Sequence, residues 1–289
     1  MTVDRASTMP APAVPTPPRS RNRIWWIAAI AAWVVLLLVL AYVSVGRAAP
    51  TVREQRSLAE ATPVVHRVLS ELVAAAGSDV VVELSAAIVD EGCRITPIRT
   101  GAALEQAVIF HTAEADGPAL LDRIAQRLPA GYRAKSRPGT DGVTHTLRAD
   151  AGEFVAIKGG VTRPGRVILT ASTGCRPTPP TPAVGTHAEA GSPIEGEPER
   201  VLAALEASAI EPVQRSSAAC PGDGAIHTVR AVGRGTAPQP LGDALRLLAS
   251  TEPVVVTDQP DRYAYRDGPL NVLVETGDGE IRAVVTHTC

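Results

Sequence analysis

The sequence has few aromatic side chains and almost no lysine. Its 289 residues include three tryptophans, four tyrosines and two phenylalanines, and all three tryptophans lie near the N-terminus. After residue 46 the aromatic residues are Phe110, Tyr132, Phe154, Tyr263 and Tyr265. Five rings are too few for a stacking platform that would bind bases or sugars, so the folded core must be aliphatic. Lys135 and Lys158 are the only lysines among 28 basic residues, a bias that indicates a GC-rich genome and no particular function.

The chain also lacks an excess of positive charge. Its formal net charge is −2, and the residues after position 46 carry 24 basic and 29 acidic side chains. A protein that binds nucleic acid needs a basic field that displaces counterions from the phosphates. We therefore expect no nucleic acid partner.

Motifs of catalysis and cofactor binding are missing. The sequence contains no GxSxG elbow, Walker loop, HExxH or GxGxxG. The four cysteines form no CxxC pair, and their spacing suits no zinc site. We therefore predict no catalytic residue, no cofactor and no metal ligand, and we favour a protein that is not an enzyme.

One long apolar segment is present. Residues 24–46 contain no charged side chain, and as a helix they would be about 34 Å long, enough to cross a bilayer. Trp25 and Trp26 lie at one end and Tyr42 near the other, where such rings favour the membrane interface. This pattern predicts a transmembrane helix in the lipid bilayer. The alternative is a cleaved signal peptide, whose apolar region normally spans about 7–15 residues.

The orientation of this helix depends on the cysteines. Basic residues flank it equally, with three arginines shortly before and three shortly after it. All four cysteines follow the helix, and disulfides persist outside the cytoplasm. We expect a single-pass protein of the cytoplasmic membrane, with its N-terminus inside and its C-terminal region extracytoplasmic.

Similar segments recur in the same order in the part that follows. HRVLSEL (66–72) resembles ERVLAAL (199–205), IFHT (109–112) resembles AIHT (225–228), and RVILTASTGC (166–175) resembles RAVVTHTC (282–289). These matches predict a duplication. The expected divisions are a disordered cytoplasmic tail (1–23), the transmembrane helix (24–46), module 1 (47–175), a proline-rich linker (176–198) and module 2 (199–289).

We predict an α+β fold in which each module reads α-β-β-α-β-β-β, with an antiparallel sheet and its helices on one face. In module 1 the first helix should begin with Thr62 as cap and Pro63 in its first turn, and end at Gly77. The second should begin at Pro118 and end before Pro129.

Four cysteines allow three pairings. The duplication selects Cys93–Cys175 and Cys220–Cys289, with one structural disulfide in each module. Each bridge would join the end of the first strand to the residues after the last strand, so we expect those two strands to be neighbours.

Several polar residues are candidates for a functional role. His111, His145, His227 and His287 each precede a threonine, and we expect them on solvated strand faces. Arg148 with Asp150, and Arg266 with Asp267, should flank hairpin turns. Tyrosine and arginine are favoured in interfaces, so Tyr263 and Tyr265, with Arg262 and Arg266, are the predicted contact patch.

The functional prediction is a non-catalytic membrane protein whose duplicated, disulfide-bonded region binds an envelope protein or a wall component. One alternative is an envelope hydrolase with its site between the modules, which would require His, Asp or Ser residues to converge there. The other is a small-ligand sensor that acts through a membrane partner, which would require an apolar pocket.

Overall fold

The computed structural model describes residues 21–47, 56–139, 144–178, 193–208, 211–250 and 252–289. The chain divides into two units, residues 1–49 and residues 50–289. The first contains α1 (Arg21–Arg47), whose apolar residues 25–44 have exposed side chains. Its segment Trp25–Ser44 is long and apolar enough to cross a membrane, as an anchor or as a signal sequence. The predicted disordered tail falls mostly on residues 1–20, outside the described residues.

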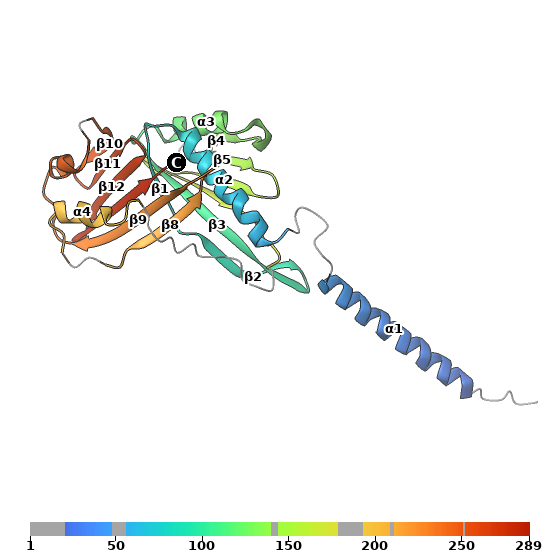
Figure 1. Cartoon of the computed structure of the whole chain (residues 1–289). Helices are drawn as coiled ribbons and strands as arrows, with labels where there is room; N and C mark the ends of the chain where they lie inside the picture. Colours follow the sequence, from blue (N-terminus) through green and yellow to red (C-terminus); the bar gives the residue numbers. More distant parts are fainter. Residues whose placement is uncertain (1–20, 48–55, 140–143, 179–192, 209–210, 251) are drawn as a thin grey trace, which may run out of the picture. The chain divides into compact units, whose positions relative to one another are not determined.

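The second unit begins with a seven-stranded antiparallel sheet, the first sheet (Figure 1). Its strands follow the order β1-β3-β7-β6-β5-β4, and β2 pairs with the other end of β3. The elements are α2 (Leu58–Ala76), β1 (Val81–Leu84), β2 (Ile88–Thr96), β3 (Arg99–His111), α3 (Gly117–Arg127), a 3-10 turn η2 (Ala130–Tyr132), β4 (Lys135–Pro138), β5 (His145–Asp150), β6 (Ala156–Arg163) and β7 (Arg166–Ser172).

A six-stranded antiparallel sheet, the second sheet, follows, with the order β10-β11-β12-β13-β9-β8. Its elements are α4 (Glu197–Ala204), β8 (Gln214–Ala219), β9 (Ala225–Arg234), α5 (Leu241–Leu245), a 3-10 turn η3 (Arg246–Leu248), β10 (Val254–Gln259), β11 (Arg262–Asp267), β12 (Leu270–Gly277) and β13 (Glu280–His287).

The α+β class is confirmed, but five strands per module were too few. The sheets have seven and six strands. The short edge strands β4 and β10 are mostly exposed. Such strands lack the alternation of apolar and polar residues by which a strand is recognised, so the sequence pattern did not reveal them all.

Helix α2 starts earlier than predicted. The Ser57 hydroxyl accepts a hydrogen bond from the Glu60 N–H (3.3 Å), and the Glu60 carboxylate accepts one from the Ser57 N–H (2.8 Å). This capping box satisfies free N–H groups at the helix start, so Pro63 lies inside the helix and Thr62 is not its cap. Gly77, with φ of 92°, ends it as expected. Helix α3 ends before Pro129, also as predicted.

Helices cover one face of each sheet. Helices α2 and α3 pack on the first sheet, α4 and α5 pack on the second, and α2 also packs against β8 of the second sheet. Between α2, α3 and the first sheet lies an aliphatic core that includes Leu69, Leu72, Val108 and Leu169. The second core, under α4 and α5, contains both tyrosines of β11.

Both predicted disulfides are present, Cys93–Cys175 and Cys220–Cys289. The strands that they connect are not neighbours, contrary to our expectation. Strand β3 lies between β2 and β7, and β9 lies between β8 and β13. At Gly101, which pairs with Cys93, an added Cβ would lie 2.1 Å from the carbonyl oxygen of Arg176. Glycine there lets the segment that carries Cys175 cross the intervening strand.

The proline-rich linker is shorter than predicted. Arg176 and Pro177 are buried in the first half of the unit, where the backbone of Arg176 pairs with Ala102 and the Pro177 carbonyl accepts a hydrogen bond from the Leu58 N–H. Ile194 is buried in the second core. Residues 179–192, the middle of the linker, lie outside the described residues.

We predict that removing either disulfide destabilises the unit. The bridges close loops with sequence separations of 82 and 69 residues. The chain-entropy model assigns about 4–5 kcal/mol to loops of this size. Replacing both members of one pair by serine should lower the free energy of unfolding of the full chain in detergent by nearly that amount, measured by denaturant titration. A loss under about 1 kcal/mol would contradict a role in stability.

Candidate functional site

Strand β1 joins the two halves of the unit. It pairs with β3 in the first sheet and contacts β9, β11, β12 and β13 of the second sheet. Val81 is buried there against Ala264, Leu273 and Val284. Strand residues alternate between faces, so Val82 and Leu84 point the other way, into the core under α2. Both faces of β1 are therefore covered.

The free backbone edge of β1 bonds to side chains of the second sheet. The Val82 N–H donates to Asn271 Oδ1 (3.1 Å), and the Leu84 N–H donates to Thr228 Oγ1 (3.0 Å). The Ser216 hydroxyl donates to the Leu84 carbonyl (2.8 Å). Buried backbone groups need such partners, and these contacts close the edge against another strand.

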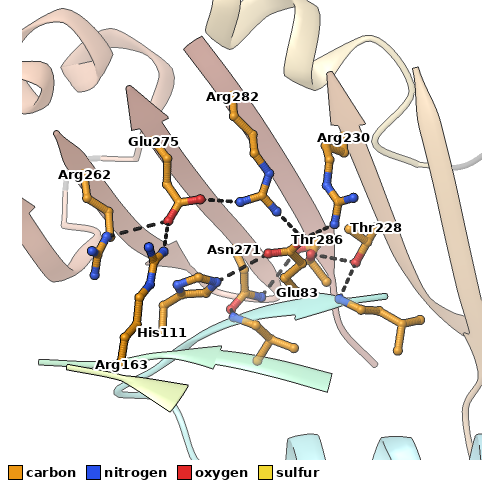
Figure 2. Close-up of polar contacts among 12 residues, drawn as sticks. Glu83, His111, Arg163, Thr228, Arg230, Arg262, Asn271, Glu275, Arg282 and Thr286 are labelled. Carbon is orange, nitrogen blue, oxygen red and sulfur yellow. Dashed lines mark hydrogen bonds and ion pairs between the residues drawn. The ribbon is translucent and has the colours of Figure 1, made fainter. Parts of the chain in front are cut away.

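Glu83 points from β1 into the junction and is fully buried. Its carboxylate accepts hydrogen bonds from the guanidinium groups of Arg230 on β9 and Arg282 on β13, as Figure 2 shows. His111 Nε2, from β3, lies 3.4 Å from the other carboxylate oxygen. The two arginine side chains keep about a quarter of their surface exposed, 27% and 23%. A buried carboxylate is thus paired with cations that reach toward solvent.

Burial and pairing act against each other on Glu83. Burial alone would raise the pKa of its carboxyl, but the hydrogen bond from His111 and the charges of Arg282 and Arg230 outweigh burial and hold the pKa well below its usual 4.5. Burial lowers the pKa of His111 below 6.5, although Glu83 partly offsets it. At neutral pH, therefore, Glu83 is charged and His111 is neutral. Because the carboxylate only accepts, His111 carries its proton on Nε2.

Glu275 on β12 forms a second centre beside the first. Arg282 bonds to Glu83 through one nitrogen and to Glu275 through the other. Arg163, from the end of β6, donates to Glu275, and Arg262 Nε lies 3.7 Å from it (Figure 2). An open polar pocket of about 260 Å³ adjoins this group. Its lining residues are Arg163, Asp261, Arg262, Glu275, Thr276, Gly277, Glu280 and Arg282.

The junction is suited to holding the sheets together. The carboxylates of Glu83 and Glu275 both pair with arginines, and the pocket is lined by three arginines and three acids. Removal of one partner of such a buried ion pair leaves a charge without compensation and strongly destabilises the fold. His111 Nδ1 is buried and accepts no hydrogen bond. Within the described ranges, no group of three His, Cys, Asp or Glu could hold a metal ion.

The structure separates the candidate histidines. His111 is fully buried at Glu83, so the expectation of a solvated position was wrong for it, because the second sheet covers its face. His145 bonds to the Ser136 hydroxyl (2.8 Å) and lies near Asp122 of α3. His227 and His287 are cross-strand partners on β9 and β13. Thr228 and Thr286, the next residues on these strands, bond to each other at the junction. Because successive strand residues point to opposite faces, His227 and His287 point away from the junction.

The predicted contact patch is not formed at the surface. Tyr263 and Tyr265 are 8% and 1% exposed, because their face of β11 packs under α5 and α4. Arg262 pairs with Glu275, and Arg266 donates to the Gly77 carbonyl (2.8 Å). The rings are core residues, and the arginines on the opposite face of β11 contact the first half of the unit.

Both arginine–aspartate pairs flank hairpin turns, as predicted, at the ends of β5 and β11. Asp150 pairs with Arg133 (3.0 Å), and it accepts from the Gly152 N–H in the turn, as its turn role predicts. Asp267 accepts from the N–H and hydroxyl of Ser250. Neither aspartate bonds to the neighbouring arginine in its own sequence pair.

Sequence reasoning missed Glu83, Asn271 and Glu275. One signal was visible: Glu83 interrupts the otherwise apolar run Val80–Leu84. A carboxylate inside such a run is costly unless it is paired, and its partners lie about 150 to 200 residues away along the chain. Local patterns carry no information about contacts at that distance.

We predict that Glu83→Gln strongly destabilises the unit. The variant leaves Arg230 and Arg282 without their shared anion, and losing one partner of a buried pair costs about 3–5 kcal/mol. We expect about 3 kcal/mol, since both arginines keep some contact with water. The control is Glu195→Gln, because Glu195 pairs with Arg215 while both are about half exposed. That change should cost under about 1 kcal/mol; equal losses in denaturant titration would contradict the prediction.

Stability should fall in two steps as the pH drops. His111 has a lowered pKa in the folded state, so the unfolded chain binds its proton first, and stability declines below about 6.5. Glu83 and Glu275 also have lowered pKa values, so a second decline begins below about 4.5. In His111→Gln the first step should shrink, measured by denaturant titration at pH 7.5, 5.5 and 4. An unchanged pH profile would contradict the role of His111.

No family model and no curated protein matches this chain. Among solved structures it has a distant similarity to the crystal structure of a DUF4853 family protein from Actinomyces odontolyticus. The two are 12% identical, with 61% of this chain and 94% of that chain covered and a TM-score of 0.35. Identity and TM-score are both too low to assign a family or a function to this chain.

Proposed function

We propose that this chain is a non-catalytic, single-pass protein of the cytoplasmic membrane. In this proposal α1 is the anchor, and residues after it form a duplicated extracytoplasmic region that binds an envelope protein or a wall component. Two features support the placement. The side chains of residues 25–44 of α1 are mostly apolar and exposed, as a helix in lipid requires, and both disulfides belong in an oxidising compartment.

The strand orders support the duplication. Five strands follow one another in the same spatial order in both sheets: β4-β5-β6-β7-β3 in the first and β10-β11-β12-β13-β9 in the second. The strand β8 of the second sheet corresponds to β1 or β2 of the first. In both halves one helix precedes the first strands and another precedes the last four. Each half also has its disulfide after the corresponding last strand.

The observation that carries the binding proposal is the paired junction. The acid and base groups between the sheets engage one another, and β1 is bonded along its free edge. Such contacts hold the two halves of the compact unit together, which suits presentation of a fixed surface. A hydrolase site between the halves would need convergent His, Asp or Ser residues, but of the four candidate histidines only His111 lies at Glu83. We therefore prefer binding.

Placement and binding can be tested in the same cells. Protease added to intact cells (with the cell wall made permeable) should digest the region after α1, and thiol alkylation should label cysteines only after reduction. Full protection, or four reactive thiols without reductant, would refute the placement. After crosslinking, the purified chain should retain a specific envelope protein or wall fragment. The control is a protein in which the same α1 segment is followed by an unrelated disulfide-bonded domain. If this control recovered the same envelope protein or wall fragment in equal amount, specific binding would be refuted.

A further inference from the structure

Both lysines of the chain lie in one row on the first sheet. The Cα register pairs Lys135 with Arg148 and Arg148 with Lys158, so three cations occupy neighbouring positions on β4, β5 and β6. Arg137 follows Lys135 by two residues on β4 and therefore lies on the same face. We call Lys135, Arg137, Arg148 and Lys158 the basic strip. All four are exposed.

The basic strip lies on the face opposite α3. Ser136 and His145 bond to each other, and His145 approaches Asp122 of that helix. Leu147 and Ile157 are buried in the core on the same side. Their sequence neighbours must then point away from the helices. The strip is consequently a feature of the helix-free face.

Few acids balance this charge. Lys158 has one ion pair, with Glu105 at 3.7 Å, and their side chains are 62% and 44% exposed, so it is weak. Asp150 is engaged by Arg133 and by the backbone N–H of Gly152. Among residues with described positions, Lys135, Arg137 and Arg148 have no carboxylate partner.

Like charges placed directly across neighbouring strands destabilise a sheet. Here two such pairs follow one another, although the region after residue 46 carries more acids than bases. An anionic ligand would remove this repulsion when it binds. The strip, unlike the Glu275 pocket, has cations that internal acids do not neutralise.

We propose that the basic strip binds the phosphate groups of an extended anionic polymer of the envelope. This rests on the proposed extracytoplasmic location and names the ligand class of the binding surface. Strands lie about 4.8 Å apart, so the row of three cations spans about 10 Å. Successive phosphates along a chain match this spacing with the side chains extended, whereas a single phosphate would require the three side chains to converge. Two threonines next to the strip offer hydroxyl donors on the same face: Thr146 is the register partner of Arg137, and Thr170 is the register partner of Lys158.

The lysine distribution provides a direct test. An amine-specific reagent can modify only Lys135, Lys158 and the N-terminal amine, and the last serves as an internal reference. Full-length protein in neutral detergent is labelled with and without linear polyphosphate as probe, and each site is quantified by mass spectrometry. We expect about threefold or greater protection of both lysines, lost at high salt because the contacts are electrostatic.

Variants separate the strip from general charge effects. Arg148→Gln should abolish most of the protection at both lysines, although neither is changed. The control Arg200→Gln removes an exposed arginine of α4 and should leave protection intact. Intact disulfides and an unchanged circular dichroism spectrum show that each variant is folded. Protection of Arg148→Gln equal to that of the original protein would overturn the proposal.

Two further arms distinguish other sources of phosphate. Inorganic phosphate at the same total concentration, and vesicles of anionic lipid, should protect much less than the polymer. Equal protection by inorganic phosphate would mean a single-anion site, and protection by vesicles alone would mean a lipid-facing surface. Either result, or no protection by any probe, overturns the proposal. The labelling is done on purified protein, so its outcome is independent of the protease test of location.

Discussion

A carboxylate in a protein interior costs several kcal/mol unless cations and hydrogen bonds compensate it. Glu83 meets this requirement with groups from three strands, His111 on β3, Arg230 on β9 and Arg282 on β13. None of these partners is local, so the charge is satisfied only when both sheets are in place. Arg282 extends the requirement to Glu275, and through it to Arg163 at the end of β6. The buried charge of Glu83 therefore helps to fix the relative position of the sheets, together with the apolar contacts of Val81.

The same contacts solve a second problem. Strand β1 has only one strand neighbour, β3, and a free edge of this kind is a template for unwanted pairing. Asn271 and Thr228 bond to the N–H groups of that edge. The polar residues of the junction thus protect β1 and orient the second sheet at once. This explains why polar side chains occur on a face of the second sheet that is otherwise buried.

Local features were predictable to the extent that they depend on local sequence. The apolar helix, the α+β class and the end of α2 at Gly77 follow from hydropathy, periodicity and a stop signal. Cysteine pairing was predictable because the repeated landmarks selected one of three pairings.

The start of α2 was missed because Thr62-Pro63 resembles a cap, whereas the capping box of Ser57 and Glu60 lies one turn earlier. Tyr263 and Tyr265 were misplaced since alternation shows that two residues share a face, but not which face is covered. The junction was not predictable because its pairs span the whole unit.

Net charge conceals how the charges are arranged. Arg230 and Arg282 of the second sheet pair with Glu83 and Glu275, so most of their charge is neutralised within the protein. The basic strip of the first sheet has the opposite arrangement, because its neighbouring acids are weakly paired or already engaged. A region with an overall excess of acids can therefore hold a local row of cations, and it would attract an anion only at short range, since the surrounding acids oppose long-range steering. Recognition of a polymer held nearby in the envelope is compatible with such a short-range surface, because tethering raises the local concentration of both partners.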